Sequence, residues 1–194
     1  MRQERNGPAT PPRGERMEKF VALLRAVNVG ARKVPMAELR EVCAGLGWSE
    51  VATYIQSGNA VFEAAAGQAE LEQQLEAALG ARFGFEVPVM VRSAAQWVGY
   101  PAANPFPEAA EKEPNRLMLM LSKQPPAVGA AAALQERARD GELVAAAGDA
   151  VWIHYPEGAG TSRLSPSLID RLIGSPATAR NFRTVLKLEE MLAC

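Results

Sequence analysis

The sequence predicts an α+β protein made of two ferredoxin-like halves of βαββαβ type, each an antiparallel sheet with helices packed on one face. Two observations carry this prediction. Short apolar runs of strand length alternate with segments in which apolar residues recur at helical spacing. The order strand, helix, strand, strand, helix, strand is complete by residue 92, and a similar order returns after residue 116. The pattern therefore indicates an internal duplication.

The first half is predicted over residues 17–92. Its strands are expected at residues 20–24, 51–56, 60–62 and 87–91. The first helix follows Pro35, because a proline suits a first helical turn in which its missing N–H costs nothing. The second helix carries Leu71, Leu75 and Leu79 on one face. Ser57 and Gly58 join the two middle strands as a hairpin.

The second half is predicted over residues 116–194, after a connector at residues 93–115 that prolines interrupt. Strands are expected at residues 117–121, 143–147 and 151–155, and helices at residues 130–138, 168–173 and around Val185, Leu188, Met191 and Leu192. Residues 1–16 have prolines, glycines, four arginines against two glutamates and no apolar periodicity. We expect them to form a disordered extension.

Composition and charge limit the classes of function. The chain has 194 residues, 48% of them hydrophobic, which is enough for a core without metals or crosslinks. Its 21 basic and 22 acidic residues argue against a nucleic-acid partner, because such proteins usually carry a basic excess. No run is long and apolar enough to enter a membrane. The two cysteines, Cys43 and Cys194, lie far apart, so we expect a soluble protein of the reducing cytoplasm.

The inventory of reactive side chains predicts no metal site and no cofactor. One histidine and two cysteines cannot complete a four-ligand zinc site of Cys and His alone. Alternation in the strand at 151–155 favours a half-exposed sheet histidine at His154 over a catalytic base. Neither of the glycine-rich phosphate motifs, G-x-G-x-x-G and G-x-x-x-x-G-K-[ST], is present.

Two polar loops are expected to converge at one edge of the first sheet. The first two strands of a βαββαβ unit run parallel, so the loop after strand one and the hairpin after strand two share that edge. The loop also opens the helix at Pro35, whose N-terminal dipole end favours an anion. The candidate ligand-binding residues are Arg25, Asn28, Gly30, Lys33, Gln56, Ser57, Gly58 and Asn59. The alternative, that these residues only build turns, stays open.

A basic stretch near the C-terminus is the second candidate region. Residues 160–187 carry five basic residues against Asp170 alone, in a body that is otherwise acidic. Arg163, Arg180, Asn181 and Lys187 are candidates for a second wall of the same ligand site. Asn181 is also suited to cap the last helix, and solvated surface charge is the alternative for the others.

The leading hypothesis is a protein that binds a small anionic or phosphate-bearing ligand in a polar pocket at one sheet edge. Two alternatives remain: a protein interaction module without a ligand, and a transferase-type enzyme of unknown substrate. The sequence leaves the ligand and the oligomeric state undetermined.

Several segments carry a resemblance to a known family. They are residues 21–30 (VALLRAVNVG), 36–40 (MAELR), 53–59 (TYIQSGN), 104–107 (NPFP) and 180–188 (RNFRTVLKL). In these segments the chain resembles the bacterial domain of unknown function 1697 family. The resemblance implies a cytoplasmic α+β protein of duplicated ferredoxin-like halves, with no established activity, substrate or cofactor. Ala26 and Ala31 replace frequent family glycines, Thr161 replaces a frequent basic residue, and Phe182 replaces the usual tryptophan.

Overall fold

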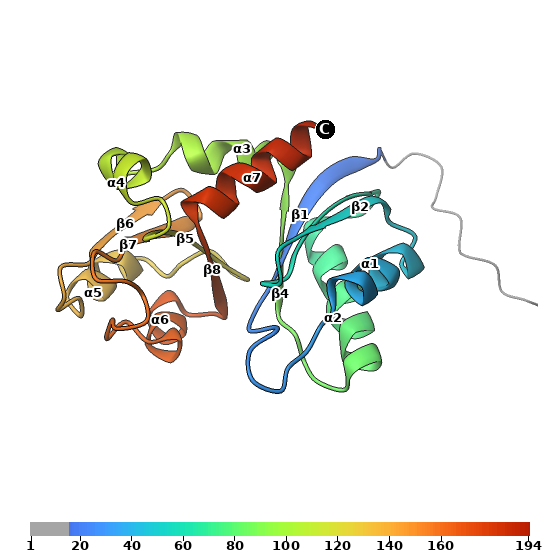
Figure 1. The fold of residues 1–194 in the computed structure, drawn as a ribbon, viewed down its shortest axis with the longest axis horizontal. Helices are drawn as coiled ribbons and strands as arrows, with labels where there is room; N and C mark the ends of the chain where they lie inside the picture. Colours follow the sequence, from blue (N-terminus) through green and yellow to red (C-terminus); the bar gives the residue numbers. More distant parts are fainter. Residues whose placement is uncertain (1–15) are drawn as a thin grey trace, which may run out of the picture.

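The first half of the chain forms a four-stranded antiparallel sheet with two helices. The computed structural model describes residues 16–194, so the expected extension lies almost entirely outside the described residues. The elements are β1 (Glu18–Leu24), α1 (Met36–Gly45), β2 (Ser49–Tyr54), β3 (Asn59–Ala64), α2 (Gln68–Phe83) and β4 (Val89–Ser93). The strand order is β2-β3-β1-β4, which confirms the predicted βαββαβ unit (Figure 1).

The second half repeats this plan with shorter helices. Its elements are β5 (Leu117–Ser122), α5 (Ala130–Gln135), β6 (Leu143–Ala147), β7 (Ala150–His154), α6 (Pro166–Ile173), β8 (Ala177–Asn181) and α7 (Phe182–Ala193). The strand order β6-β7-β5-β8 matches that of the first sheet, which fits a duplication. Helices α1 and α2 have 10 and 16 residues, whereas α5 and α6 have 6 and 8.

Three local features differ from the sequence prediction. Strand β8 was not expected, because its sequence ATARN lacks the apolar run that marks a buried strand. The connector contains two helices, α3 (Ala94–Ala102) and α4 (Pro107–Lys112). Ser93 and Gln96 form a capping box at the start of α3, a signal that the prolines obscured. Helix α5 ends at Gln135, three residues before the predicted boundary.

The two central strands are buried on both faces. On β1, Phe20, Ala22 and Leu24 belong to the core beneath α1 and α2, while Val21 and Leu23 belong to a second core between the two sheets. Strand β5 behaves in the same way, with leucines in the shared core and Met120 beneath α6. This double burial explains why both strands are continuous apolar runs in the sequence.

Helices α3 and α7 close the junction between the halves. Each begins directly after the last strand of its half, and they lie together across one end of both sheets (Figure 1). The indole Nε1 of Trp97 on α3 donates a hydrogen bond to the carbonyl of Val185 on α7, at 3.1 Å. The shared core therefore ties the halves into one unit. Within residues 16–194, no helix combines the length and apolarity needed to cross a membrane.

Candidate functional site

The loop after β1 and the β2–β3 hairpin lie against each other at one edge of the first sheet. The amide of Leu24 donates to the carbonyl of Gly58 at 2.8 Å. The side chain of Asn28 donates to the carbonyls of Gln56 and Val34 and accepts from the amide of Val34. Asn28 is thus the residue that holds the loop closed onto the hairpin.

Gly58 is required where the hairpin meets β1. Its φ of +77° lies in the left-handed region, and a Cβ there would come within 2.7 Å of both Leu24 Cβ and Val27 Cγ2. No other residue fits this approach without moving the backbone.

Arg180 crosses from the second half into this edge. Its side chain is buried, with 6% of the residue exposed. Nη2 donates to the carbonyls of Leu24, Ser57 and Gly58 at 2.9, 2.9 and 3.1 Å, and Nε donates to Asn59 Oδ1. Nη1 donates to the carbonyl of Ala179 and to Thr178 Oγ1. We call this group, Arg180 with Asn59 and the three carbonyls of the first half, the Arg180 clasp.

The Arg180 clasp contains no anion. All six acceptors are neutral, and among the described residues no carboxylate forms an ion pair with Arg180. Burial lowers the pKa of Arg180 to about 10, which leaves its guanidinium charged at neutral pH. The protein therefore holds a buried positive charge that is hydrogen-bonded but not neutralised.

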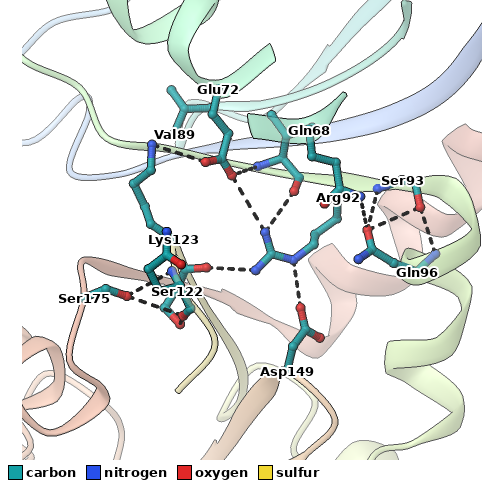
Figure 2. A network of polar contacts seen from close by, with 12 residues as sticks. Gln68, Glu72, Val89, Arg92, Ser93, Gln96, Ser122, Lys123, Asp149 and Ser175 are labelled. Carbon is teal, nitrogen blue, oxygen red and sulfur yellow. Dashed lines mark hydrogen bonds and ion pairs between the residues drawn. The ribbon is translucent and has the colours of Figure 1, made fainter. Parts of the chain in front are cut away.

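A second arginine makes the reciprocal contact from the first half (Figure 2). Arg92 Nε donates to Asp149 Oδ2 at 3.1 Å, Nη1 to the carbonyl of Val91 at 2.9 Å and Nη2 to the carbonyl of Ser122 at 2.8 Å. The hydroxyl of Tyr100 donates to Asp149 Oδ1 at 2.9 Å. We call this group, Arg92 with Asp149 and the carbonyl of Ser122, the Arg92 clasp.

The two clasps occupy equivalent positions in the two halves. Each arginine is the second-last residue of its half's last strand. In each, Nη1 binds the preceding carbonyl and Nη2 binds the last residue of the other half's first strand, Leu24 or Ser122. In each, Nε binds a residue that begins or directly precedes the third strand of the other half: Asn59 in one, Asp149 in the other. The duplicated halves thus hold each other through matching contacts.

The correspondence extends to the residue that directly follows the first strand of each half, which is Arg25 after β1 and Lys123 after β5. Arg25 Nη1 pairs with Asp170 Oδ2 on α6 at 2.7 Å, and Asp170 Oδ1 accepts the amide of Ala177. In the same manner Lys123 pairs with Glu76 on α2 at 2.6 Å, and Glu76 accepts the amide of Val89. Both pairs bridge the two halves.

The two groups differ in charge. Around the Arg180 clasp, Arg180 and Arg25 face one carboxylate, Asp170, so the net charge is +1. Around the Arg92 clasp, Arg92 and Lys123 face three carboxylates, so the net charge is −1. Two of them, Asp149 and Glu72, are labelled in Figure 2, and the third is Glu76. Asn59, which contacts Nε of Arg180 where Asp149 contacts Nε of Arg92, contributes to this difference.

A cavity of about 320 Å³ lies beside the positive group. Arg25 and Ala26 form its wall from the first half, and β5, β8, α6 and the segment before α6 form the rest. The apolar lining includes Met118, Met120, Tyr155, Leu164, Ile169 and Ala179. Thr178, whose hydroxyl accepts from Arg180, is also in the wall. The short α5 and α6 leave this part of the sheet face uncovered, whereas the longer α1 and α2 cover the corresponding face in the first half.

The structure brings part of the predicted site together and places part of it elsewhere. Arg25, Asn28, Gln56, Ser57, Gly58, Asn59 and Arg180 meet at the edge where the two loops converge. Of the predicted residues, Arg25 alone lines the cavity. Gly30 and Lys33 are exposed on the loop, and Arg163 is exposed next to the cavity residue Leu164.

Two predicted residues of the second wall have other contacts. Asn181 caps α7 by accepting the amide of Thr184 at 2.9 Å. Lys187 pairs with Glu190 along the same helix at 2.8 Å. Sequence reasoning did not single out the cavity's apolar residues or Asp170, because Met and Ile at strand or helix spacing look like ordinary core. The one available signal was Asp170 as the single acid in the basic stretch.

His154 offers no nucleophilic pair. Its Nε2 lies 2.9 Å from Glu113 Oε2, and Glu113 also pairs with Arg116. In the part of the chain that the structure describes, no serine, threonine or cysteine hydrogen-bonds to the His154 ring. In the same part, no group of three or more His, Cys, Asp or Glu side chains could hold a metal ion.

The fold and the paired clasps define a protein of two similar ferredoxin-like halves, and comparison with known proteins gives its family. Residues 17–152 match the family described as protein of unknown function (DUF1697), so the chain belongs to that family, which confirms the resemblance seen in the sequence. The structure of conserved bacterial protein SP0830 from Streptococcus pneumoniae has the same fold, with a TM-score of 0.72 and 24% identity over 91% of this chain and 99% of that one. A comparison with curated proteins gave no match.

Proposed function

We propose that the protein binds a small molecule with an apolar body and one anionic group, a carboxylate or a phosphate, in the cavity between Arg25 and α6. The observation that carries this proposal is an apolar cavity of about 320 Å³ directly beside a group of net charge +1. Cavities of about this size and largely apolar lining are typical of small-molecule sites.

The apolar lining supports binding of the ligand body. Met118 and Ala179 are half-buried on the sheet face, and Met120 and Ile169 lie deeper. A ligand that covers them removes apolar surface from water, which is favourable by about 0.8 kcal/mol for each buried methylene. Methionine side chains are flexible, so they adapt to apolar bodies of different shape.

Arg25 supports binding of the anionic end. In the described structure its guanidinium has one anionic partner, Asp170, which occupies Nη1. The other N–H donors of the guanidinium are available to a carboxylate or phosphate at the cavity wall. Hydrogen bonds of this charge-assisted kind contribute about 1.5 to 3 kcal/mol each. Asp170 is held in turn by the amide of Ala177, so Arg25 is fixed in place before a ligand arrives.

A thermal-shift screen followed by ligand-observed NMR tests the proposal. The probes are straight-chain carboxylates of graded length, phenyl-substituted carboxylates and alkyl phosphates, each with its neutral amide or alcohol. We expect the acids with apolar bodies to raise the melting temperature most and inorganic phosphate alone to do little. Binding by none of these probes would overturn the proposal and favour the interaction-module alternative.

Two variants locate the site. Arg25→Met removes the anchor and is expected to weaken binding of the acids at least about tenfold, the equivalent of about 1.4 kcal/mol. Lys123→Met is the matched control, because Lys123 occupies the equivalent position beside the other clasp and does not line this cavity. Equal effects of the two variants on acid binding would place the ligand elsewhere.

A further inference from the structure

We propose that Arg180, which does not line the cavity, is the residue that makes the site select anionic over neutral ligands. This inference rests on the proposed function and names the source of its charge specificity. Arg180 is buried, has only neutral hydrogen-bond partners and reaches the cavity wall through Thr178.

The Arg25–Asp170 pair cannot supply that selectivity by itself. Asp170 lies 2.7 Å from Arg25, so its negative charge offsets part of the attraction that an anion bound to Arg25 experiences. The pair therefore anchors and orients the anionic group but brings no net charge to the site.

The field of Arg180 is not cancelled in this way. Its partners are the carbonyls of Leu24, Ser57 and Gly58, the amide oxygen of Asn59 and the hydroxyl of Thr178. Neutral acceptors of this kind solvate a charge without neutralising it. For an anion about 6 Å away, at an effective dielectric constant of about 20, such a charge changes affinity by about a hundredfold. Water at the cavity mouth reduces this figure, so we expect at least about tenfold.

The Arg92 clasp shows how this charge can be removed. There the carboxylate of Asp149 accepts from Nε of Arg92, whereas the amide oxygen of Asn59 accepts from Nε of Arg180. Asn59→Asp therefore places a carboxylate against Nε of Arg180, as Asp149 does against Nε of Arg92. It removes the net +1 and leaves every cavity residue unchanged. Its local cost is the loss of the two hydrogen bonds that Asn59 Nδ2 donates, to the carbonyl of Tyr54 and to Ser57 Oγ, each at 2.9 Å.

A second variant removes the charge at its source and leaves every cavity residue unchanged. Arg180→Gln takes away the positive charge but keeps a side-chain amide that can donate to the surrounding carbonyls. Arg180→Lys is its control, because lysine keeps the charge. If Asn59→Asp does not fold, Arg180→Gln and Arg180→Lys test whether Arg180 sets the preference for anions.

The experiment measures the affinity ratio of octanoate to octanamide by titration calorimetry, in the full chain at neutral pH. Wild type should prefer octanoate, and the ratio should fall at least about tenfold in Asn59→Asp and in Arg180→Gln, while octanamide affinity changes less than about threefold. Arg180→Lys should keep the wild-type ratio. Asp149→Asn, which removes the carboxylate from the Arg92 clasp, should also keep the wild-type ratio of octanoate to octanamide affinity.

The outcomes separate this inference from the proposed function. A wild-type protein that binds neither octanoate nor the other probes of the screen overturns the proposed function. A wild-type protein that prefers octanoate, with the same ratio in both charge-neutralising variants, overturns only the role of Arg180. Salt gives a further check, because a buried charge is screened less than a surface charge. Loss of the preference at moderate salt would therefore contradict a buried source.

Discussion

Arg180→Met tests the idea that the clasp holds the two halves together. Methionine keeps an unbranched side chain but removes all six hydrogen bonds that the guanidinium donates. The carbonyl of Ser57 and Oδ1 of Asn59 then lose the one donor that the described structure gives each of them. A buried acceptor without a donor costs about 1 to 3 kcal/mol. Relief of the buried charge offsets part of this, so we expect a net loss of about 2 to 4 kcal/mol.

Urea unfolding followed by tryptophan fluorescence and circular dichroism measures this loss. Tryptophan fluorescence reports on both cores, because Trp48 lies in the core of the first half and Trp97 and Trp152 lie in the shared core, while circular dichroism reports on the helices and strands. Arg183→Met is the control, since Arg183 is exposed on α7, and it should change the free energy of unfolding by less than about 0.5 kcal/mol. A loss below about 1 kcal/mol in Arg180→Met would refute the structural role of the clasp.

Two further predictions concern the hairpin and the thiols. Gly58→Ala should lower the free energy of unfolding by more than about 2 kcal/mol, because the positive φ costs about 1 to 2 kcal/mol and the new Cβ lies 2.7 Å from two side chains. Gly148→Ala, in the matching turn with open space around it, should show the φ cost alone in the same urea assay. Burial raises the pKa of the Cys43 thiol to about 12, so mass spectrometry after alkylation of native protein should find Cys194 modified and Cys43 not. Equal labelling of both thiols before unfolding would show that the core opens.

The first half was predictable because each of its elements carries a strong local signal. The run at residues 20–24 is apolar at every position, and the structure shows why: alternate side chains enter two different cores. The helix after Pro35 and the helix through Leu71 and Leu75 both pack one apolar face on the sheet. Local pattern and tertiary environment agree in this half.

Strand β8 was not predictable from local pattern, for a physical reason. It is an edge strand that pairs only with β5. It carries Arg180, a residue that single-sequence rules assign to the surface. Its burial depends on acceptors contributed by Leu24 and by the hairpin at Asn59, more than a hundred residues away in the chain. No window around residue 180 contains that information.

The candidate site could also be predicted only in part from the local sequence pattern. The convergence of the loop after β1 with the β2–β3 hairpin follows from the topology of one half, so it could be reasoned from the sequence. The cavity depends on how the two halves dock and on the shortness of α5 and α6, which leaves Met118 and Ala179 uncovered. The partner of Arg25 could not be found from the first half alone, because Asp170 belongs to the second.

The unequal charges of the two clasps carry a functional argument. Asp149, which contacts Nε of Arg92, has a side chain that is 35% exposed, whereas Asn59, which contacts Nε of Arg180, is fully buried. A carboxylate at Asn59 would carry a desolvation cost of its own and would lose the hydrogen bonds that Nδ2 donates to Tyr54 and Ser57. The first half therefore faces the cavity of the second half with a neutral amide and without a counter-charge for Arg180. An anion in the cavity would supply the missing counter-charge of Arg180 only when bound, which is the behaviour that a site selective for anions requires.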